Sequence, residues 1–561
     1  MLSEKIQKLI EAEFPGNDIS VTVPEVQTHG HFTTNLAFSL AKKERMSPMQ
    51  AAEKIKSAVI AEDPEKLIEK IEVAAPGFVN FWLTPKSIQD IFARISQSKN
   101  FGKSKVGDGR KIIVEYSSPN IAKPMHVGHF RATIIGDALA NIHKALGYKV
   151  IRWNYLGDWG VQFGKLTAAY KMWGDAKKLK AEPIKHLLEL YVRFSAQAKI
   201  NPEFENLGQL EFKKLENGDK GNRKLWELFR KVSLKDFDKV YKMLGVKFDV
   251  EIGESFYESH LKPLTKSLVK DGIAKRSEGA LIIDLEKYGL PRALVEKSDG
   301  ASLYLTRDLA NIKYRLSKYK TDKIIHVVGQ EQSLHFQQFF RVAEMLGLGK
   351  DKFFHVGTAL VLGPDGKKLS TREGKTIFIE DIINEALSIT REIVKEKNSS
   401  VSAKEREKIA KVVAIGALKY NDLSQSRLSN IIFDWNKMLS FEGDSGPYLQ
   451  YTYVRLKSIL RKMRPSKFDP KVLALPGELD LILKLDRFPE AIQKSAETFY
   501  PHYLAQYLYD LAKSASRFYE EHPVLKAESA VRKARLALIS CAADALKTGL
   551  NLLGVETLER M

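Results

Sequence analysis

The sequence predicts an α/β protein in which a parallel sheet is assembled from two separated parts of the chain. A small α+β module precedes the sheet, and a helical half follows it. Three observations predict this arrangement. A strand, a helix and a second strand follow one another over residues 111–157, which is the pattern of a βαβ unit. The pattern resumes near residue 323, and beyond about residue 380 apolar residues recur at helical spacing.

The first hundred residues favour short strands and helices in alternation. Residues 19–26, ISVTVPEV, and residues 78–83, FVNFWL, are rich in β-branched and aromatic side chains, which is typical of strands. PMQAAEKIKSAVI, which lies between them, has a helical period. The glycine- and lysine-rich stretch FGKSKVGDGRK ends this part of the chain. We therefore expect a separate module over residues 1–108.

The first half of the sheet begins with KIIVEYSS, residues 111–118, a continuous apolar run typical of a strand buried on both faces. HFRATIIGDALANIHKALG follows with helical spacing and ends at Gly147, a residue type common just past a helix. YKVIRWNYLG is the next strand. Two strands joined through a helix imply a parallel pair.

The second half of the sheet begins after SLYLTRDLANIKYRL, with the strand KIIHVVG at residues 323–329. A helix, LHFQQFFRVAEMLG, and a strand-like segment, FFHVGTALVLG, come next. The residues between the halves are rich in lysine and mostly helical. We expect one domain over residues 109–385, with a helical insertion at about 165–275.

Helices dominate the remainder of the chain. GPYLQYTYVRLKSILRKM and ARLALISCAADALKTGLNLLG have apolar faces at helical spacing, and the clearest loop is RPSKFDPKVLALPGE. We expect a helical linker region over residues 386–443 and a helical domain over residues 444–561.

The composition excludes several classes of protein. Cys541 is the single cysteine among 561 residues, so a disulfide within the chain and a zinc site built from cysteines are both impossible. No apolar run reaches the length of a membrane span. The N-terminus lacks the apolar core of a secretory signal. We expect a cytoplasmic protein with no membrane partner.

The charge balance points to an anionic partner. The chain has 89 lysines and arginines against 69 aspartates and glutamates, a formal charge of +20. Such an excess favours nucleic acid as a partner. The alternative is a surface that is simply rich in lysine.

Two histidines stand three residues apart in NIAKPMHVGHF, residues 120–130, between the first strand of the sheet and its helix. His126 and His129 have three interpretations: ligands of a metal ion, ordinary side chains at a helix start, or donors to a phosphate. The position favours the third, because a helix N-terminus has free N–H groups and partial positive charge. Gly128 allows a ligand to approach the backbone closely.

A second loop has a composition suited to a triphosphate. DGKKLSTREGK, residues 365–375, combines basic side chains with two hydroxyls but lacks the spacing of a Walker A motif. It is either a solvated turn or a cationic loop that closes on a triphosphate. The sequence has no G-x-G-x-x-G, so a dinucleotide cofactor has no support.

These features together resemble the class I aminoacyl-tRNA synthetases, and specifically the arginyl enzymes. His126-Val127-Gly128-His129 resembles the HIGH signature of the class, and Lys368-Leu369-Ser370-Thr371-Arg372 occupies the place of the KMSKS loop. Thr371 departs from the lysine usual in the class, and Lys123, just before the HIGH signature, is thought to substitute in arginyl enzymes. The resemblance covers essentially the whole chain, through VEYSSPNIAKPMHVGHFR, HFTTNLAFSLAK, APGFVNFWL, YLTRDLA, VVGQEQSLHFQQ and SGPYLQYTYVRLKSI.

The resemblance implies a specific domain plan. It implies a split Rossmann-type (HUP-like) catalytic domain over residues 109–385, preceded over residues 1–108 by an N-terminal tRNA-binding domain of the arginyl type. A helical stem-contact linker over residues 386–443 and an all-helical, DALR-type anticodon-binding domain over residues 444–561 would follow. A monomer is the family expectation.

The resemblance also implies an arginine–tRNA ligase. The carboxylate of L-arginine attacks the α-phosphate of ATP, and pyrophosphate leaves. A ribose hydroxyl of the 3′-terminal adenosine of tRNA(Arg) then takes the arginyl group. ATP, accompanied by Mg²⁺, is a substrate, and neither a permanently bound cofactor nor a metal site in the protein is implied. The expected catalytic residues are His126, His129, Lys123 and Lys368, and the expected ATP-binding residues are Gly128, His126, His129, Lys368, Ser370 and Arg372.

The guanidinium of arginine requires carboxylates in a planar, bidentate arrangement. By resemblance, Tyr304 and Asp308, one helical turn apart, belong to this site, and Glu115 is the second carboxylate. The residues expected to hold the amino and carboxylate ends of arginine are Ser118, Asn120 and Gln332. The alternatives are that Glu115 is a surface acid and that Asp308 is a charge favoured by a helix N-terminus. A site built for a planar fork would leave groups unpaired with lysine.

For tRNA, the resemblance implies that Phe78, Asn80 and Phe81 contact the elbow and that the helical C-terminal domain binds the anticodon. Three other identities stay open. A cysteinyl enzyme lacks support because its zinc-binding cysteines are missing, and a small nucleotidylyltransferase of the HIGH type would leave most of the chain unexplained. The third is a non-catalytic RNA-binding relative, against which the intact His126, His129 and Lys123 argue.

Overall fold

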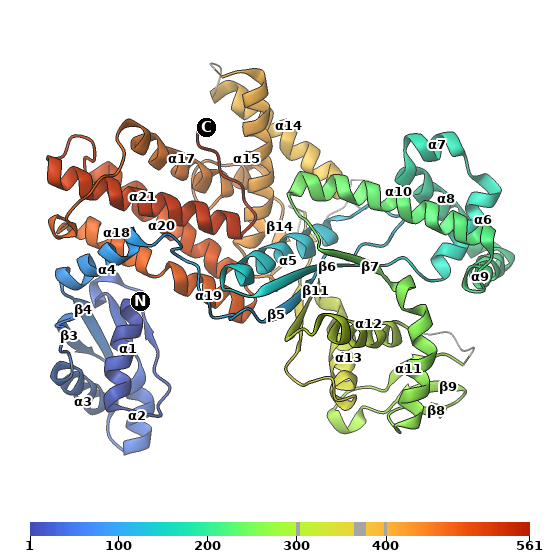
Figure 1. Ribbon diagram of the computed structural model, residues 1–561, viewed down its shortest axis with the longest axis horizontal. Coiled ribbons are helices and arrows are strands. Elements are labelled where there is room, and N and C mark those ends of the chain that lie inside the picture. Colours follow the sequence, from blue (N-terminus) through green and yellow to red (C-terminus); the bar gives the residue numbers. More distant parts are fainter. Residues whose placement is uncertain (299–302, 364–376, 398–400) are drawn as a thin grey trace.

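The computed structural model describes residues 1–298, 303–363, 377–397 and 401–561. Its centre is a five-stranded sheet with the order β12-β11-β5-β6-β7, in which every neighbouring pair is parallel (Figure 1). The strands are β5 (Lys111–Glu115), β6 (Lys149–Leu156), β7 (Val250–Gly253), β11 (Lys323–Gly329) and β12 (Phe353–Thr358). The predicted α/β fold class is confirmed.

The two halves of the sheet meet where β5 pairs with β11, so that Glu115 lies directly opposite His326. The middle of β5 is fully buried, which explains its continuous apolar run. The helix α5 (Val127–Ala145) packs against β6 and β11. The helices α12 (Tyr304–Tyr319) and α13 (Ser333–Met345) belong to the second half of the domain and pack against each other.

The predicted helical insertion, about residues 165–275, needs a correction. β7 lies inside that range, yet it pairs with β6 as the edge strand of the central sheet. The sequence did not indicate this strand because its four residues, VEIG, contain no apolar run. The helices between β6 and β7 are α6 (Val161–Trp173), α7 (Ala176–Ala181), α8 (Pro183–Ile200), α9 (Pro202–Glu216) and α10 (Lys220–Leu244).

After β7 the chain forms a smaller unit before it returns to the sheet. Three short antiparallel strands, in the order β10-β9-β8, make up its own sheet. Its elements are the 3₁₀ turn η2 (Glu254–Tyr257), α11 (Glu258–Lys270), β8 (Lys275–Ser277), β9 (Ala280–Ile283), η3 (Glu286–Tyr288) and β10 (Ala293–Glu296). Another 3₁₀ turn, η4 (Gln330–Gln332), joins β11 to α13.

The N-terminal module is the predicted α+β unit, with an antiparallel sheet in the order β1-β2-β4-β3. Only two residues of the predicted strand at 19–26 pair, and the following Pro24 has no backbone N–H to continue the ladder. The elements are α1 (Leu2–Glu13), β1 (Val21–Thr22), η1 (Gln27–His29), β2 (Phe32–Thr34), α2 (Leu36–Glu44), α3 (Pro48–Ala61), β3 (Ile68–Ala74), β4 (Phe78–Leu83) and α4 (Pro85–Gln97).

The C-terminal half is helical, apart from a short parallel pair of β13 (Val361–Leu362) and β14 (Ile431–Ile432). Its helices and turns are α14 (Ile379–Lys397), α15 (Ala403–Leu423), α16 (Trp435–Met438), α17 (Gly446–Lys462), η5 (Pro470–Val472), α18 (Pro476–Asp486), α19 (Phe488–Thr498), α20 (His502–Glu521) and α21 (Ser529–Leu552). Within the described ranges, no helix is long and apolar enough to cross a membrane.

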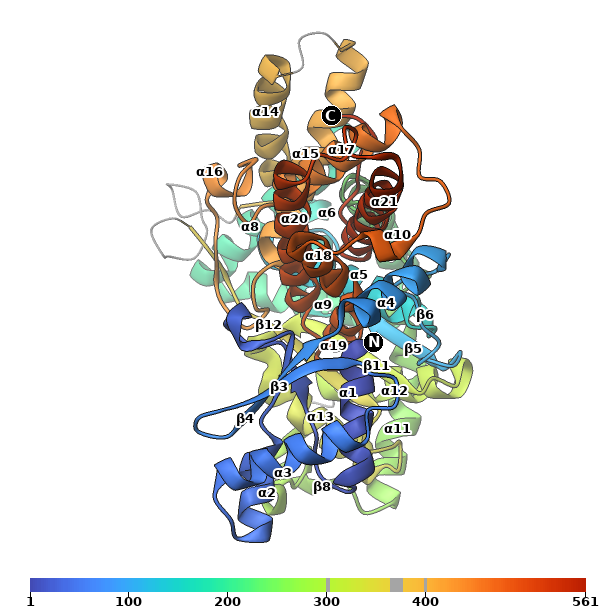
Figure 2. The ribbon, with the colours of Figure 1, turned by 90° about the vertical axis from the view of Figure 1, so that its left-hand side faces the viewer.

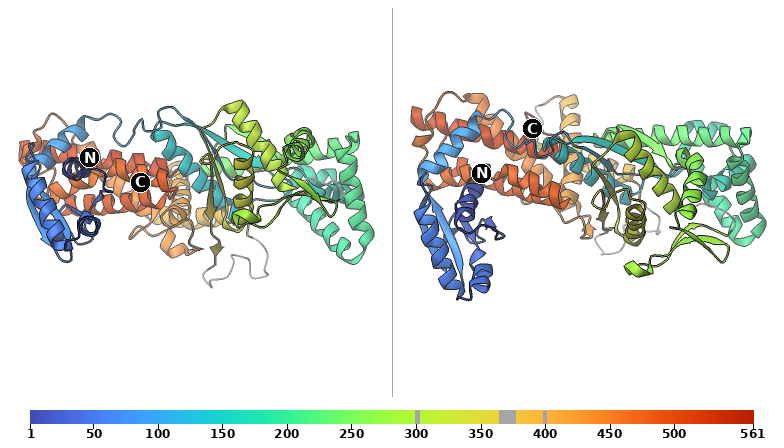
Figure 3. Two further views of the ribbon diagram at one scale, coloured as in Figure 1. Left: turned by 90° about the horizontal axis from the view of Figure 1, so that it is seen from below. Right: turned by 60° about the horizontal axis from the view of Figure 1, so that its bottom comes forward.

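The molecule is elongated, with the N-terminal module and the helices α6–α10 at opposite ends (Figure 3). The module lies below the C-terminal helices when the molecule is viewed from that end (Figure 2). Three hydrogen bonds attach it to them: Leu2 N–H donates to Asp486 Oδ2 at 2.7 Å, and Gln89 Nε2 donates to Leu473 O at 2.9 Å and to Lys471 O at 3.3 Å. These contacts anchor the module to the helical half.

Candidate functional site

Polar side chains gather at the carboxyl ends of the central strands. Glu115 ends β5, Asp158 follows β6, Glu254 follows β7 and Gln332 lies in the turn after β11. Because these strands are parallel, their carboxyl ends lie along one edge of the sheet. Open α/β sheets bind their ligands at this edge. Of the residues predicted to bind ATP and arginine, Ser118, Asn120, His126, Gly128 and His129 follow β5 and Gln332 follows β11, whereas Tyr304 and Asp308 begin α12, which precedes β11.

The loop that follows β5 has an unfavourable backbone conformation. Ser117, Ser118 and Ala122 have φ angles of 73°, 47° and 61°, a region that costs a residue other than glycine about 1–3 kcal/mol. Contacts from α10 hold the loop. Ser117 Oγ lies 2.8 Å from the hydroxyl of Tyr241, and the Ala122 N–H donates to Ser233 Oγ at 2.8 Å. Strain that the surrounding structure maintains is typical of functional sites.

His126 and His129 lie at the N-terminus of α5, as predicted. His126 is the residue that caps the helix, and its Nδ1 accepts a hydrogen bond from the Gly128 N–H at 3.1 Å. His129 Nδ1 accepts from the His126 N–H at 3.2 Å. The two rings lie against each other, with their centres 3.8 Å apart. Both histidines therefore satisfy backbone donors of the first helical turn.

These hydrogen bonds determine which nitrogen carries the proton in each neutral ring. A nitrogen that accepts a hydrogen bond is unprotonated, so the neutral form of each imidazole has its proton on Nε2. Burial and the neighbouring His126 lower the pKa of His129 to about 3. His129 is thus neutral near pH 7 and offers an Nε2–H donor. A helix N-terminus with such a donor favours an anion.

Lys123 lies three residues before His126, at the end of the strained loop. Its ammonium group is 4.6 Å from the centre of the Tyr191 ring, which belongs to α8. A cation–π contact of this kind stabilises by only about 0.5–1 kcal/mol when exposed. The Lys123 ammonium group can therefore leave the ring to bind a phosphate. Its role as a catalytic residue stays a prediction.

Lys368, Ser370 and Arg372 lie outside the described residues. The chain that follows them is described, and it pairs with the start of α5. The Val127 N–H donates to Ile377 O at 3.4 Å, and the Ile379 N–H donates to Met125 O at 3.0 Å. The described residues Ile377 to Ile379 therefore lie beside the start of α5.

Glu115 is almost fully buried, at 4% exposure, and two groups of the chain itself contact its carboxylate. Oε2 forms an ion pair with Arg315 of α12, and Oε1 lies 3.0 Å from His326 Nδ1. Burial alone would raise the pKa of Glu115, but Arg315 and His326 outweigh it and lower the pKa to about 2. Glu115 is therefore charged at the sheet edge. A substrate guanidinium would have to share an oxygen with Arg315 or His326.

Tyr304 and Asp308 occupy the first turns of α12, one turn apart, as predicted. Tyr304 is 66% exposed, whereas Asp308 is half-buried. His335 Nε2 lies 2.7 Å from Asp308 Oδ2, which fixes the carboxylate on the side of α12 that faces α13. The structure therefore places one predicted carboxylate and one predicted aromatic ring together.

Sequence reasoning missed Glu254, which directly follows the edge strand β7. Burial raises the pKa of Glu254 to about 8, and the nearby Asp308, Asp158 and Glu258 add to this effect, while Arg307 opposes it. Burial and several neighbouring acids favour the protonated form of this carboxyl group. A cation that binds nearby would favour its charged form instead. No sequence signal marked this residue, because β7 itself has no clear pattern.

The segment that carries Glu254 is held in place by Asp158. Asp158 Oδ1 accepts from the Ser255 N–H at 2.9 Å, and its Oδ2 accepts from Ser255 Oγ at 2.9 Å. Arg230 of α10 contacts the same carboxylate at 3.2 Å. The loops after β6 and β7 are thus locked together.

The residues expected to hold the ends of arginine lie at the same edge. Ser118 follows β5, and its Oγ is buried without a hydrogen-bond partner among the described residues. Asn120 forms an isolated parallel bridge with Gly157 after β6. Gln332 is exposed at the start of α13. Their predicted contacts with arginine stay predictions.

The residues predicted to contact the tRNA elbow differ in accessibility. Phe81 is fully buried in the core of the N-terminal module, and Asn80 is 4% exposed. Phe78 is 39% exposed and packs edge-on against Phe38. Phe81 points to the face of β4 opposite Phe78 and lies in the core, whereas Asn80 shares the face of Phe78 but is largely covered. Of the three side chains only Phe78 is exposed, and the predicted elbow contacts stay predictions.

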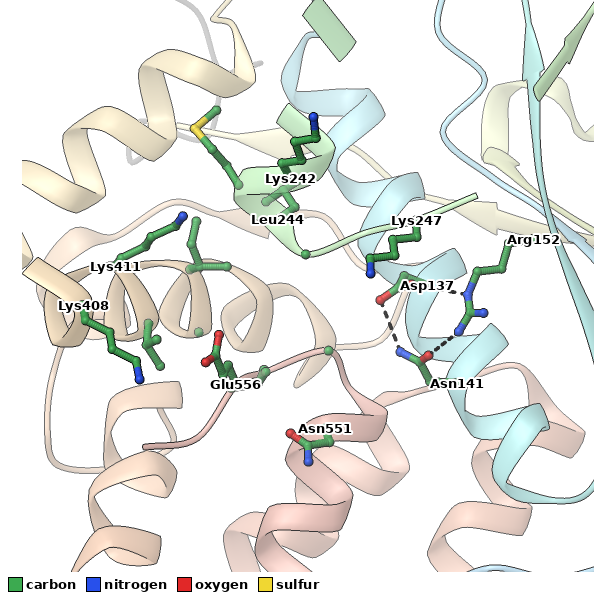
Figure 4. A pocket seen from close by; sticks show the side chains of 17 residues that line it. Asp137, Asn141, Arg152, Lys242, Leu244, Lys247, Lys408, Lys411, Asn551 and Glu556 are labelled. Atoms are coloured by element: carbon green, nitrogen blue, oxygen red, sulfur yellow. Dashed lines mark hydrogen bonds and ion pairs between the residues drawn. The ribbon is translucent and has the colours of Figure 1, made fainter. Parts of the chain in front are cut away.

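A cavity of about 580 Å³ lies away from this edge, between α5, α10, α15 and the segment after α21 (Figure 4). On its wall, Arg152 donates to Asn141 Oδ1 at 2.7 Å, and Asn141 donates to Asp137 Oδ2 at 3.2 Å. Of the predicted site residues that the structure describes, none lines this cavity. The cavity and the sheet edge are separate features.

Comparisons with known proteins cover the whole chain. The family model described as "tRNA synthetases class I (R), catalytic domain" matches residues 90–435, "Arginyl tRNA synthetase N terminal domain" matches residues 1–83, and "DALR anticodon binding domain" matches residues 449–561. The chain is 40% identical to a protein of Clostridioides difficile named "Arginine--tRNA ligase", over 100% of this chain and 98% of that protein.

Two solved structures share the fold over the full length. The arginyl-tRNA synthetases of Plasmodium falciparum and Thermus thermophilus each superpose with a TM-score of 0.85, at 26% and 27% sequence identity. Each match covers 100% of this chain and 99% of the other.

Proposed function

The chain belongs to the class I arginyl-tRNA synthetases, and from this premise we propose how its own residues carry out the reaction. The chain is an ATP-dependent aminoacyl-tRNA ligase with arginine, ATP and tRNA as partners. It activates L-arginine with ATP to arginyl-adenylate and pyrophosphate, and it then transfers arginine to the 3′-terminal adenosine of tRNA(Arg). We further propose that it acts as a monomer in the cytoplasm.

The phosphates of ATP bind at the N-terminus of α5. The bond that breaks joins the α-phosphorus to the oxygen of the leaving pyrophosphate, and negative charge moves onto that pyrophosphate. His126 and His129 stabilise this charge through Nε2–H donors. Their geometry supports this role, because both Nδ1 atoms already accept backbone N–H groups. Fixed donors that point to developing charge are an effective source of catalysis in phosphoryl transfer.

Basic side chains complete the phosphate site. Lys123 leaves the ring of Tyr191 and contacts the triphosphate, which arrives with Mg²⁺ as part of the substrate. Lys368, Ser370 and Arg372, which precede Ile377 in the chain, also contact the triphosphate. The pairing of Ile377 and Ile379 with the start of α5 supports this role.

The guanidinium of arginine binds among the acids at the edge of the sheet. Asp308 accepts from it directly, Glu254 supplies a second carboxylate, and Tyr304 covers the site from the first turn of α12. The raised pKa of Glu254 supports this role, since a bound cation would favour its charged form. Glu115 stays ionised beside this site, and Arg315 balances its charge in an ion pair. Ser118, Asn120 and Gln332 hold the amino and carboxylate ends.

The helical C-terminal domain binds the anticodon through exposed aromatic and basic side chains. Tyr451 of α17 is 40% exposed, and the guanidinium of Arg455 lies 4.9 Å from the ring centre of Tyr519 and 5.7 Å from that of Tyr451. Unstacked RNA bases bind on such surfaces. Phe78 of the N-terminal module contacts a different part of the tRNA, its elbow.

One observation carries the proposal: the two histidines at the start of α5 and the acidic side chains of Asp308 and Glu254 lie at the same edge of the sheet. The test is ATP–pyrophosphate exchange with each amino acid in turn, with and without unfractionated tRNA. We expect exchange with arginine and not with lysine, appearing or rising when tRNA is added. Asp308→Asn should raise the KM for arginine about 10- to 100-fold, whereas the exposed Asp351→Asn should not.

Other outcomes would redirect the proposal. Exchange with a different amino acid would remove Asp308 and Glu254 from a guanidinium site. Folded protein that binds tRNA but shows no exchange under any condition would make the chain a non-catalytic RNA-binding relative.

A further inference from the structure

The hydroxyl of Tyr155, near the end of β6, is buried and has no hydrogen-bond partner among the residues that the structure describes. A buried hydroxyl without a partner destabilises a protein, and a phenylalanine would fill the same space without this cost. The oxygen is therefore available to a group that enters from outside the chain.

Neighbouring side chains orient the Tyr155 ring. It packs edge-on against Tyr257, with ring centres 6.1 Å apart, and the Arg315 guanidinium lies 5.7 Å from its centre. Trp153 lies two residues earlier in β6 and so points to the same face of the sheet. The Arg315 guanidinium lies 4.2 Å from the centre of the Trp153 ring. Tyr155 is thus on the face of the sheet that carries Arg315.

The strand register places Tyr155 between two of the acids. Trp153 lies opposite Glu115 of β5, and Tyr155 lies opposite Ile252 of β7, two residues before Glu254. Burial and then Asp308, Glu254 and Glu115 raise the pKa of Tyr155 well above its ordinary value. The hydroxyl consequently keeps its proton, and the charges of nearby acidic side chains act on it.

A protonated phenol among carboxylates can donate its own hydrogen to an acid, but its oxygen still needs a donor. A guanidinium has five N–H donors in one plane. Carboxylates on one side of the group cannot accept all five, so a donor remains for a neutral acceptor. A guanidinium bound near Asp308, Glu254 and Glu115 would present such a donor to Tyr155.

We propose that Tyr155 determines specificity for arginine by accepting a hydrogen bond from the guanidinium of the bound substrate. The inference rests on the proposed arginine site and adds a neutral acceptor to its carboxylates. It assigns to β6 a direct contact with the substrate.

Tyr155→Phe tests the proposal without a change of shape. We expect the KM for arginine in pyrophosphate exchange, and the Kd for arginine from calorimetry without ATP, to rise about 10- to 100-fold, as for loss of a hydrogen bond to a charged group. The KM for ATP should stay within about threefold. The melting temperature should be unchanged or higher, because the variant loses no hydrogen bond within the described protein.

Tyr507→Phe is the matched control. Its buried hydroxyl donates to Lys484 O at 2.9 Å in the helical domain, so this variant should melt at a lower temperature and keep its KM for arginine. An unchanged KM and Kd for arginine in Tyr155→Phe, with a wild-type protein that shows arginine-dependent exchange, would overturn the inference. A wild-type protein without such exchange would overturn the proposed function instead.

Discussion

At the scale of single residues, each histidine of α5 uses its two ring nitrogens differently. Nδ1 of His129 accepts the His126 N–H at 3.2 Å and so caps the helix, whereas Nε2 is the atom that carries the proton of the neutral ring. With a pKa near 3, His129 does not gain charge between pH 5 and pH 8. The catalytic role proposed for it is therefore that of a fixed donor and not of a group that transfers a proton.

Two substitutions at His129 should separate capping from donation. His129→Asn places an oxygen near the position of Nδ1, so the cap and the melting temperature are retained. It removes the Nε2–H donor, and the maximal rate of pyrophosphate exchange should fall about 100- to 1,000-fold. His129→Gln places an amide near Nε2 but removes the acceptor, so it should retain more of the rate and lose about 0.5–2 kcal/mol of stability. Equal rates in the two variants would contradict this division of roles.

At the scale of elements, the position of α5 above β5 depends on one glycine. A Cβ at Gly136 would lie 2.2 Å from the Cβ and Cγ of Tyr116, which follows β5 and is fully buried. These atoms are close to the backbone and cannot move aside easily. Gly136 therefore lets the helix approach the strand closely, and the same helix carries the histidines at its start.

Gly136→Ala should accordingly move α5 away from the sheet. Alanine favours a helix more than glycine does, yet the overlap should destabilise the protein by about 1–3 kcal/mol. The exchange rate should fall as well, because the histidines move with the helix. Gly221→Ala is the control: this exposed position in α10 has only an Asp219 oxygen nearby, at 3.3 Å, and the variant should be as stable or up to about 1 kcal/mol more stable. Urea unfolding measures both, and a stable Gly136→Ala would show that the contact yields.

At the scale of the whole molecule, the sheet and the C-terminal helices meet at residues 424–430. The Arg427 guanidinium donates to Gly357 O of β12 at 2.8 Å and to Phe499 O, at the end of α19, at 3.0 Å. Arg131 of α5 donates to Ser429 O at 2.8 Å and to Ser426 O at 3.2 Å. This one short loop therefore connects the helical domain, the edge strand β12 and the helix α5.

Arg427→Gln should weaken this connection. The variant loses two charge-assisted hydrogen bonds and a stacking contact with Tyr500, whose ring centre is 4.2 Å from the guanidinium. We expect a loss of about 2–3 kcal/mol in the free energy of unfolding. Arg517→Gln removes the same charge from a side chain that is 75% exposed and paired with Glu521 in its own helix, and it should cost less than about 0.5 kcal/mol. Similar urea midpoints for the two variants would show that Arg427 does not hold the domains together.

Local patterns in the sequence were sufficient for much of the fold. KIIHVVG and FVNFWL coincide with β11 and β4, because a strand covered on one or both faces has a regular apolar pattern. The histidines were placed correctly at a helix start, since the residues before them break a strand and the residues after them have helical spacing. The family signatures, which are also local, indicated the catalytic and helical domains.

Tertiary structure alone decided which side chains meet. The ion pair of Glu115 with Arg315 joins residues 200 positions apart, and no periodicity encodes such a distance. The roles proposed for Glu254 and the Tyr155 hydroxyl depend on burial and on neighbouring charges, which arise from the packing of several strands and helices. The sequence by itself thus determined the elements and the family. Tertiary packing decided the electrostatics of the proposed arginine site, because desolvation and charge interactions exist only once the chain has folded.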